Sequence, residues 1–130
     1  MFKNRCTLSS NTFPYRAYWD FNPKDRYSEV GLIIKSFVST YVQKITCHQG
    51  RYIALDLYLP ARKLKIINIY NHQKVNWLAS SSNQGSCGQS FANYVIQQIT
   101  EAENHGFNVI ILGDFNLSPT EYLNQQALGH

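Results

Sequence analysis

The amino-acid sequence predicts a mixed α/β protein, and three observations carry this prediction. Several short segments in the first half have the composition and the alternation of β-strands. An amphipathic helix is expected at 89–105, and a β-branched apolar run follows it at 109–112. Strands followed by a strand–helix–strand unit are typical of the α/β class. The length of 130 residues fits one domain rather than two.

The clearest strand is expected at 51–59. The odd-numbered residues from 53 to 59 are apolar and alternate with even-numbered residues, one of which is Asp56. This alternation is the two-residue period of a half-buried strand. A tight turn at 60–63 and a second strand at 64–70 complete a hairpin. Odd-numbered residues of the second strand are expected on one face and even-numbered residues on the other.

Three shorter strands are expected earlier in the chain, at 15–19, 30–34 and 41–47. The segment 20–28 contains an Asn-Pro-Lys-Asp run and is expected to be a loop. Residues 1–14 are polar and turn-like, so this N-terminal segment is expected to lack a defined element.

The second half begins with a long polar loop at 71–88. In the helix expected at 89–105, apolar residues recur at helical spacing, and the following Gly106 supplies a C-terminal cap. The run 109–112 predicts a strand that is buried on both faces. A further helix is expected to begin with an N-cap, a first-turn proline and a capping-box glutamate, which are Ser118, Pro119 and Glu121.

Charge is unevenly distributed along the chain. Residues 1–74 hold all 12 basic residues and four acidic ones, a net charge of +8, whereas residues 75–130 hold four acidic residues and no Lys or Arg. Such asymmetry is compatible with a nucleic-acid surface beside an acidic site and with a solvated basic face. The charge distribution alone favours the solvated face.

The composition and the N-terminal residues argue against a membrane-spanning protein, a secreted protein, and a disulfide or zinc scaffold. No apolar run approaches the roughly 18 residues of a membrane helix, so no membrane partner is expected. The first eleven residues lack the apolar core of a secretory signal. Cys6, Cys47 and Cys87 are too few and too scattered for a disulfide framework or a zinc site. Reduced thiols and an intracellular location are therefore expected, in the nucleus or the cytoplasm.

Candidate functional residues lie where two strands of the expected crossover end. Strands 64–70 and 109–113 run parallel if the helix between them connects them in one sheet, and ligands bind beyond the carboxyl ends of such strands. Tyr70 ends the first strand, and Asp114 and Asn116 leave the second on one side if the backbone stays extended. Phenol, carboxylate and carboxamide groups are compatible with phosphate-ester chemistry. The same pattern is explained equally well if Asp114 is an ordinary turn residue and Tyr70 is an aromatic residue of the core.

The segment 109–116, VIILGDFN, resembles the ILGDFN motif of the endonuclease/exonuclease/phosphatase superfamily. The segments VGLII at 30–34, GRYIALDL at 50–57 and IINIY at 66–70 resemble further strands of that superfamily, in the same order. The resemblance covers most of residues 15–122. It implies a deoxyribonuclease-I-like fold, a four-layer α/β sandwich in which two packed mixed β-sheets are flanked by helices, of which this chain is a part. Endonucleases of retroelements are among the proteins with this motif.

The resemblance also implies roles for individual residues. Tyr70 matches the tyrosine that binds the scissile phosphate, Asp114 the aspartate that orients or deprotonates the attacking water, and Asn116 the asparagine that holds the phosphate and that aspartate. Asn68 matches an asparagine that supports the tyrosine, and His72 replaces a common proline and is a candidate phosphate contact. The implied cofactor is Mg²⁺ or Mn²⁺, with Asp114 as a candidate ligand, and the implied partner is nucleic acid.

Two motifs of the superfamily have no counterpart in this sequence. No glutamate stands where the metal-ligating residue is expected, and no Ser-Asp-His motif follows residue 116. The resemblance therefore implies that residues 15–130 are the middle portion of an incomplete domain. We expect the isolated chain to be inactive in phosphodiester hydrolysis, because removing one member of a concerted site abolishes most of the rate.

Three alternatives stay open. The chain is also compatible with a non-catalytic remnant or truncated product that at most binds nucleic acid. A phosphatase for small phosphoesters or inositol phosphates shares the same core strands. A small α/β interaction module without a site is the third alternative, and nothing in the sequence indicates a specific protein partner.

Overall fold

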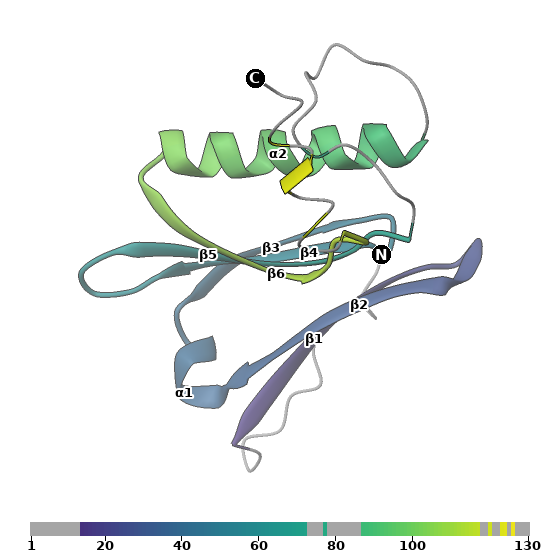
Figure 1. Ribbon diagram of the computed structural model, residues 1–130. Helices are drawn as coiled ribbons and strands as arrows, with labels where there is room; N and C mark the ends of the chain where they lie inside the picture. The colour runs from purple at the N-terminus through teal and green to yellow at the C-terminus, as the bar shows by residue number, and fades with distance from the viewer. Residues whose placement is uncertain are drawn as a thin grey trace.

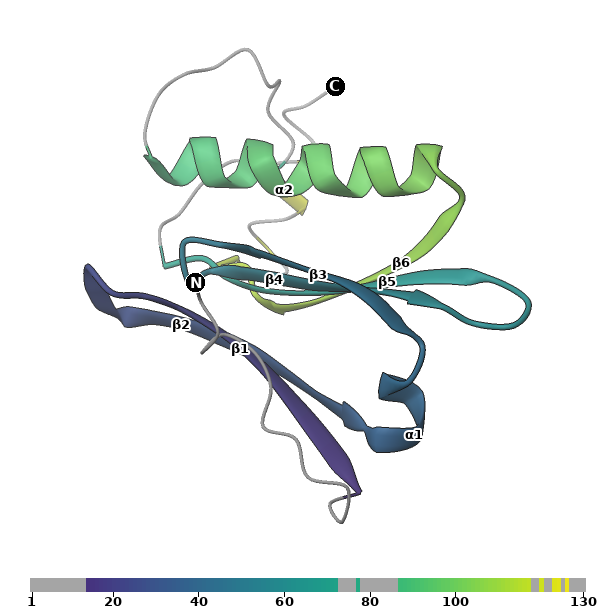
Figure 2. The ribbon, with the colours of Figure 1, turned by 180° about the vertical axis from the view of Figure 1, so that it is seen from behind.

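The computed structural model describes residues 14–72, 77, 87–117, 120, 123, 124 and 126. This part of the chain forms two β-sheets with one long helix packed on the larger sheet, so three layers follow one another (Figures 1 and 2). The elements are β1 (Tyr15–Asn22), β2 (Asp25–Lys35), α1 (Ser36–Ser39), β3 (Val42–His48), β4 (Tyr52–Tyr58), β5 (Lys63–Tyr70), α2 (Cys87–Asn104) and β6 (Phe107–Asp114). The predicted α/β class and the two packed sheets are confirmed.

The two sheets differ in size and in strand direction. Sheet A, the pair β1–β2, is antiparallel, and sheet B has the order β3-β4-β5-β6. Neighbouring strands of sheet B are antiparallel except β5 and β6, which run parallel and are joined through α2. The predicted strand–helix–strand crossover is therefore confirmed. In the described residues only sheet B is mixed, and no helix layer covers the outer face of sheet A, so the expected outer fourth layer is not seen there.

Strand β4 is buried on both faces, although its alternating sequence predicts a half-buried strand. All six residues from 52 to 57 are buried. Tyr52 and Ala54 pack under α2, whereas Ile53 and Leu55 pack against sheet A. The prediction of one exposed face is wrong because β4 is a central strand with a layer on each side. Even Asp56 is buried there.

Strand β6 shows the opposite deviation. Its apolar run predicts burial on both faces, but Ile110 and Leu112 are 46% and 43% exposed. Strand β6 lies at the edge of sheet B, and sheet A contacts β4 and β5 but does not extend under β6. The prediction of full burial is wrong because the apolar sequence does not reveal where the second sheet stops.

The expected loop at 20–28 is instead most of a β-hairpin. Strand β1 continues to Asn22 and β2 begins at Asp25, so only Pro23 and Lys24 form the turn. The helix expected at 89–105 is confirmed as α2, which starts two residues earlier and ends one residue earlier. No helix of the described residues has both the length and the apolar character needed to cross a lipid bilayer.

Several predictions fall outside the described residues. They concern the N-terminal segment before Pro14, most of the loop 71–88, the thiol of Cys6, the side chain of Cys87, and the helix start at Ser118, Pro119 and Glu121. Cys47 lies in β3 and is partly buried, and the reduced state of the three cysteines stays a prediction.

Candidate functional site

Tyr70 and Asp114 end two neighbouring parallel strands and are register partners across them. Register partners in a sheet point to the same face, and here that face turns toward sheet A. The Asn71 N–H donates to the Asp114 carbonyl oxygen over 2.8 Å, which extends the pairing one residue beyond β5. The structure therefore brings both residues to one sheet edge, as the crossover argument predicts. Their chemical roles stay predictions.

Asn116 lies next to Asp114 through a turn rather than through extended backbone. The prediction of extended backbone is wrong, because β6 ends at Asp114 and Asn116 has a φ of 53°. Asparagine tolerates this left-handed region better than most residues. In this turn the Asn116 N–H donates to Asp114 Oδ1 over 2.9 Å. One carboxylate oxygen is thus fixed by the backbone, while the Asp114 side chain stays exposed to water.

Two residues that sequence reasoning missed hold this turn in place. Gly113 has a φ of +127°, and a Cβ there would overlap the Ile69 carbonyl oxygen in β5, so glycine alone permits this close approach. The Trp77 indole N–H donates to the Phe115 carbonyl oxygen over 3.1 Å, and the two rings lie 5.5 Å apart. A lone tryptophan within a polar run was the sequence signal for a packed residue.

Asn68 joins the two sheets. Its Nδ2 donates to the Gly31 carbonyl oxygen in β2 over 2.6 Å. Because the side chain of Asn68 is held by sheet A, it positions the end of β5, and Tyr70 two residues later, relative to β2. The predicted support of Tyr70 by Asn68 stays a prediction. Direct substrate binding by Asn68 stays a prediction.

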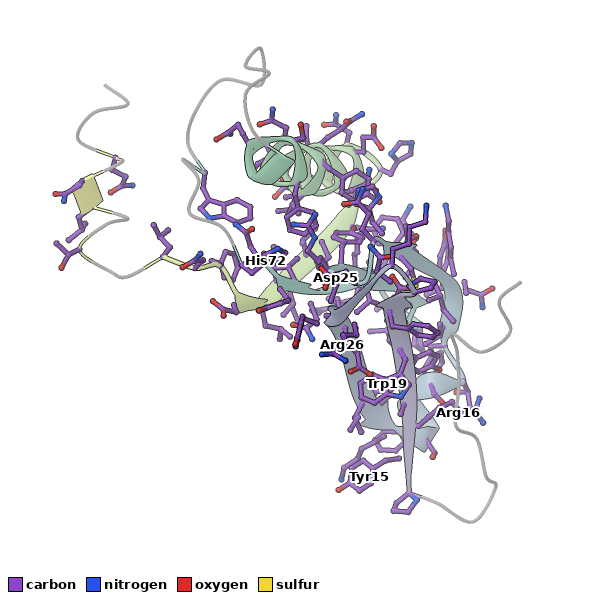
Figure 3. All side chains as sticks on the ribbon, turned by 90° about the vertical axis from the view of Figure 1, so that its right-hand side faces the viewer. Tyr15, Arg16, Trp19, Asp25, Arg26 and His72 are labelled. Carbon is purple, nitrogen blue, oxygen red and sulfur yellow. The ribbon has the colours of Figure 1, made fainter. Side chains whose placement is uncertain are left out.

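A pocket of about 210 Å³ opens beside Tyr70. Its lining residues are Asp25, Tyr27, Tyr70 and His72. The rings of Tyr70 and His72 lie 5.6 Å apart, and Figure 3 shows His72 close to Asp25. Sheet A thus contributes one wall of the pocket and the end of β5 the other. His72 is exposed, in agreement with the sequence expectation of a loop residue.

Asp25 adds a negative charge to this pocket. The Ser28 hydroxyl donates to Oδ2 over 2.7 Å and the Tyr27 N–H donates to Oδ1 over 3.1 Å. These two hydrogen bonds lower the pKa of Asp25 below its ordinary value, and the charges of His72 and Arg51 lower it further. Sequence reasoning missed Asp25 because it predicts a loop at 20–28, although an Asp whose side chain accepts from the N–H two residues later is a known turn signal.

The carboxylates around Tyr70 are too few to hold a hard divalent cation alone, so a substrate phosphate would have to supply further ligands. Among the described residues, no group of three or more His, Cys, Asp or Glu side chains converges on one point. Mg²⁺ is commonly held by one or two carboxylates, with substrate phosphate and water as the remaining ligands. Asp114, exposed beside Tyr70, is such a carboxylate. A phosphate beside the charged Asp25 is also unfavourable unless a cation offsets the repulsion.

Another hollow, of about 550 Å³, lies at the opposite end of sheet B. Its most buried charges already neutralise each other, since Lys65 Nζ donates to Asp56 Oδ1 over 2.7 Å. Lys63 lies over the Phe107 ring at 4.8 Å. Because Asp56 and Lys65 are paired with each other, we assign this hollow a structural role.

Comparisons with known proteins add no family to this geometry. A scan against protein families finds no match to the chain, and a search among curated proteins finds no relative.

Proposed function

We propose that this chain carries part of the active site of a divalent-metal-dependent phosphodiester hydrolase of the deoxyribonuclease-I-like type, acting on nucleic acid. The observation that carries the proposal is the pairing of Tyr70 with Asp114 at the carboxyl ends of β5 and β6. Both residues were singled out by a sequence motif, and the parallel register makes them neighbours on one face. Ligands of α/β sheets bind at this position.

The residues divide the chemistry between them in this proposal. Asp114 orients a water molecule and accepts its proton as the water oxygen attacks phosphorus. The Tyr70 hydroxyl donates to a phosphoryl oxygen, on which negative charge grows in the transition state. Asn116 supports Asp114 through the hydrogen bond from its backbone N–H. The bond from phosphorus to the leaving oxygen breaks, and that oxygen takes up a proton from a solvent water molecule. A bound Mg²⁺ or Mn²⁺ would supply charge neutralisation at the phosphate.

The charge distribution supports a polyanionic substrate. Residues 1–74 carry a net charge of +8, and they include both strands of sheet A and most of sheet B. Phosphate contacts from Lys and Arg supply most of the affinity of proteins for nucleic acid. Small phosphoesters and inositol phosphates are the second substrate class within the proposal.

The chain contains no counterpart of the superfamily's metal-ligating glutamate or of its Ser-Asp-His motif. The test of the proposal therefore measures binding first and cleavage second. We expect Mg²⁺ to raise the affinity of the purified chain for a short labelled oligonucleotide, and the Asp114→Asn variant to lose this rise. We also expect no nicking of a plasmid above the blank. The matched control is Glu103→Gln, which removes an equal charge from an exposed residue near the end of α2, away from the pocket.

Each outcome decides between the alternatives. If oligonucleotide binding responds neither to Mg²⁺ nor to Tyr70→Phe and Asp114→Asn, the chain is a non-catalytic protein that only binds nucleic acid. A Mg²⁺-dependent affinity for inositol phosphates without one for the oligonucleotide would assign the second substrate class. Plasmid nicking that Asp114→Ala abolishes would establish the hydrolase and refute the expected inactivity.

A further inference from the structure

A second pocket lies at the same end of sheet B, on the face that α2 covers. It has a volume of about 160 Å³ and is lined by His48, Gln49, Arg51, Ser90 and Phe91. This volume is below the roughly 300 Å³ of pockets that enclose a drug-sized ligand. A single phosphate group is therefore a better match for it than a whole nucleotide.

The tight turn between β3 and β4 fixes the polar wall of this pocket. Gln49 and Gly50 have φ values of 57° and 67°, and the Arg51 N–H donates to the His48 carbonyl oxygen over 3.0 Å. These are the features of a type I′ hairpin turn. The Gly50 N–H donates to the buried Asp20 Oδ2 over 2.8 Å, which ties the turn to sheet A. His48 and Arg51 are thus held side by side on a rigid support.

The guanidinium group of Arg51 has a donor to spare. Its Nη2 donates to Gln49 Oε1 over 3.1 Å, and its Cζ lies 4.9 Å above the Phe91 ring. Its Nη1 is buried and has no hydrogen-bond partner among the described residues. A buried cationic N–H without an acceptor is unfavourable. Because the side chain of Gln49 is exposed, an anionic acceptor can take its place beside the guanidinium group.

His48 and Ser90 add two further polar groups. The His48 imidazole is stacked on Tyr94, with ring centroids 4.0 Å apart, so its orientation is fixed by packing. Ser90 lies on α2 at the mouth of the pocket and is exposed. A guanidinium group, an imidazole and a hydroxyl around one small pocket form a donor set for phosphate oxygens.

The pocket is close to the candidate active site but on the other face of the sheet. The Tyr70 N–H donates to the Arg51 carbonyl oxygen over 2.8 Å, so the two residues are direct neighbours on β5 and the start of β4. Figures 1 and 2 show the β3–β4 turn, the start of α2 and the end of β5 at the same end of the molecule. A chain of phosphates that crosses this end meets both positions.

We propose that the pocket of His48, Arg51 and Ser90 binds a backbone phosphate of the nucleic-acid strand whose neighbouring phosphate lies at Tyr70. This inference rests on the proposed function for its substrate class. It assigns a subsite that fixes the path of the strand over the end of sheet B. The same donor set is also compatible with free phosphate, and the experiment separates these two sources.

The experiment measures the anisotropy of a short fluorescein-labelled oligonucleotide with the full chain, in EDTA and over about 50 to 200 mM NaCl. We expect Arg51→Gln to weaken binding by about tenfold and to lower the slope of log affinity against log salt by about one. We expect Ser90→Ala to weaken binding by a few-fold. The matched control is Arg62→Gln, which removes the same charge from an exposed residue in the β4–β5 turn at the opposite end of sheet B.

The outcomes are distinguishable from those of the proposed function, because EDTA removes Mg²⁺ and no hydrolysis is measured. Equal losses in Arg51→Gln and Arg62→Gln would overturn the subsite, and so would unchanged binding in Ser90→Ala and Arg51→Gln. Should Arg51→Gln fail to fold by circular dichroism, Ser90→Ala and Arg51→Lys decide in its place. A rise in the thermal unfolding midpoint with inorganic phosphate that Arg51→Gln abolishes, without any oligonucleotide binding, would assign free phosphate and refute the strand path.

Discussion

Tyr70 and Asp114 are register partners across the only parallel strand pair in the described residues. Their backbones are linked further by the hydrogen bond from the Asn71 N–H to the Asp114 carbonyl oxygen. The relation between the two side chains therefore depends on main-chain pairing. A change that separates β5 from β6 at this point is expected to disrupt the candidate site without touching either side chain.

Gly113→Ala is the sharpest test of this dependence. A Cβ at residue 113 would overlap the Ile69 carbonyl oxygen, and the φ of +127° is unfavourable for any L side chain. We expect a loss of at least about 2 kcal/mol in the free energy of unfolding, measured with urea. Gly106→Ala is the matched control, because Gly106 also has a positive φ but a Cβ there meets open space or the end of the Lys63 side chain. The control is expected to cost about 1 kcal/mol. Equal losses in the two variants would contradict the close approach of β6 to β5.

The contact between Asn68 and Gly31 predicts a second stability difference. Asn68→Ala removes the 2.6 Å hydrogen bond that joins β5 to β2 and leaves the Gly31 carbonyl oxygen without this donor. We expect a loss of about 1 to 2 kcal/mol in the free energy of unfolding. Asn108→Ala, at an exposed position of β6, is the control and is expected to stay within about 0.5 kcal/mol of the unchanged chain. A loss in Asn68→Ala no greater than in the control would remove the proposed link between the sheets.

Local patterns predicted the central part of the fold and the sheet edge at which the candidate residues meet. Three elements were predicted from patterns within their own sequences, and all three are confirmed. The patterns are the alternation at 64–70, the helical spacing in α2 and the β-branched run at 109–112. The parallel pairing then followed from the general geometry of crossovers. Tyr70 and Asp114 needed no side-chain information to be placed together.

The predictions were wrong where the surroundings of a residue depend on elements that are distant in the sequence. Burial of β4 on both faces and exposure of Ile110 in β6 depend on how far sheet A extends, which no single strand encodes. Asp25 and Arg51 reach the candidate pockets through hairpin turns whose position in space depends on the packing of two sheets. The left-handed turn at Asn116 depends on the hydrogen bond that its backbone N–H donates to the Asp114 carboxylate. The sequence therefore predicted the strand ends better than the side-chain surroundings.

The buried ion pair between Asp56 and Lys65 predicts strong non-additivity. Both residues are almost fully buried, and Lys65 Nζ lies 2.7 Å from Asp56 Oδ1. Lys65→Met leaves a buried carboxylate without its partner, so we expect a loss of about 3 to 5 kcal/mol in the free energy of unfolding. The double variant Asp56→Leu/Lys65→Met removes both charges and is expected to recover most of that loss. Urea unfolding of the two single variants and the double variant measures the coupling energy. Additive losses would mean that the pair is not desolvated in solution.

The pH dependence of stability is expected to report the surroundings of His48. Burial lowers the pKa of His48 below its ordinary value of 6.5, and the nearby charge of Arg51 lowers it further. The unfolded chain then binds more protons at this residue than the folded chain, so stability rises with pH. The contribution is present above about pH 6.5 and is lost as the pH falls from there through the lower pKa of the folded state.

His48→Phe keeps an aromatic ring against Tyr94 and Phe91 but cannot be protonated. We expect its urea midpoint to fall less than that of the unchanged chain between about pH 7 and pH 5. Identical slopes in the two proteins would show that His48 is as free to take up a proton in the folded state as in the unfolded chain.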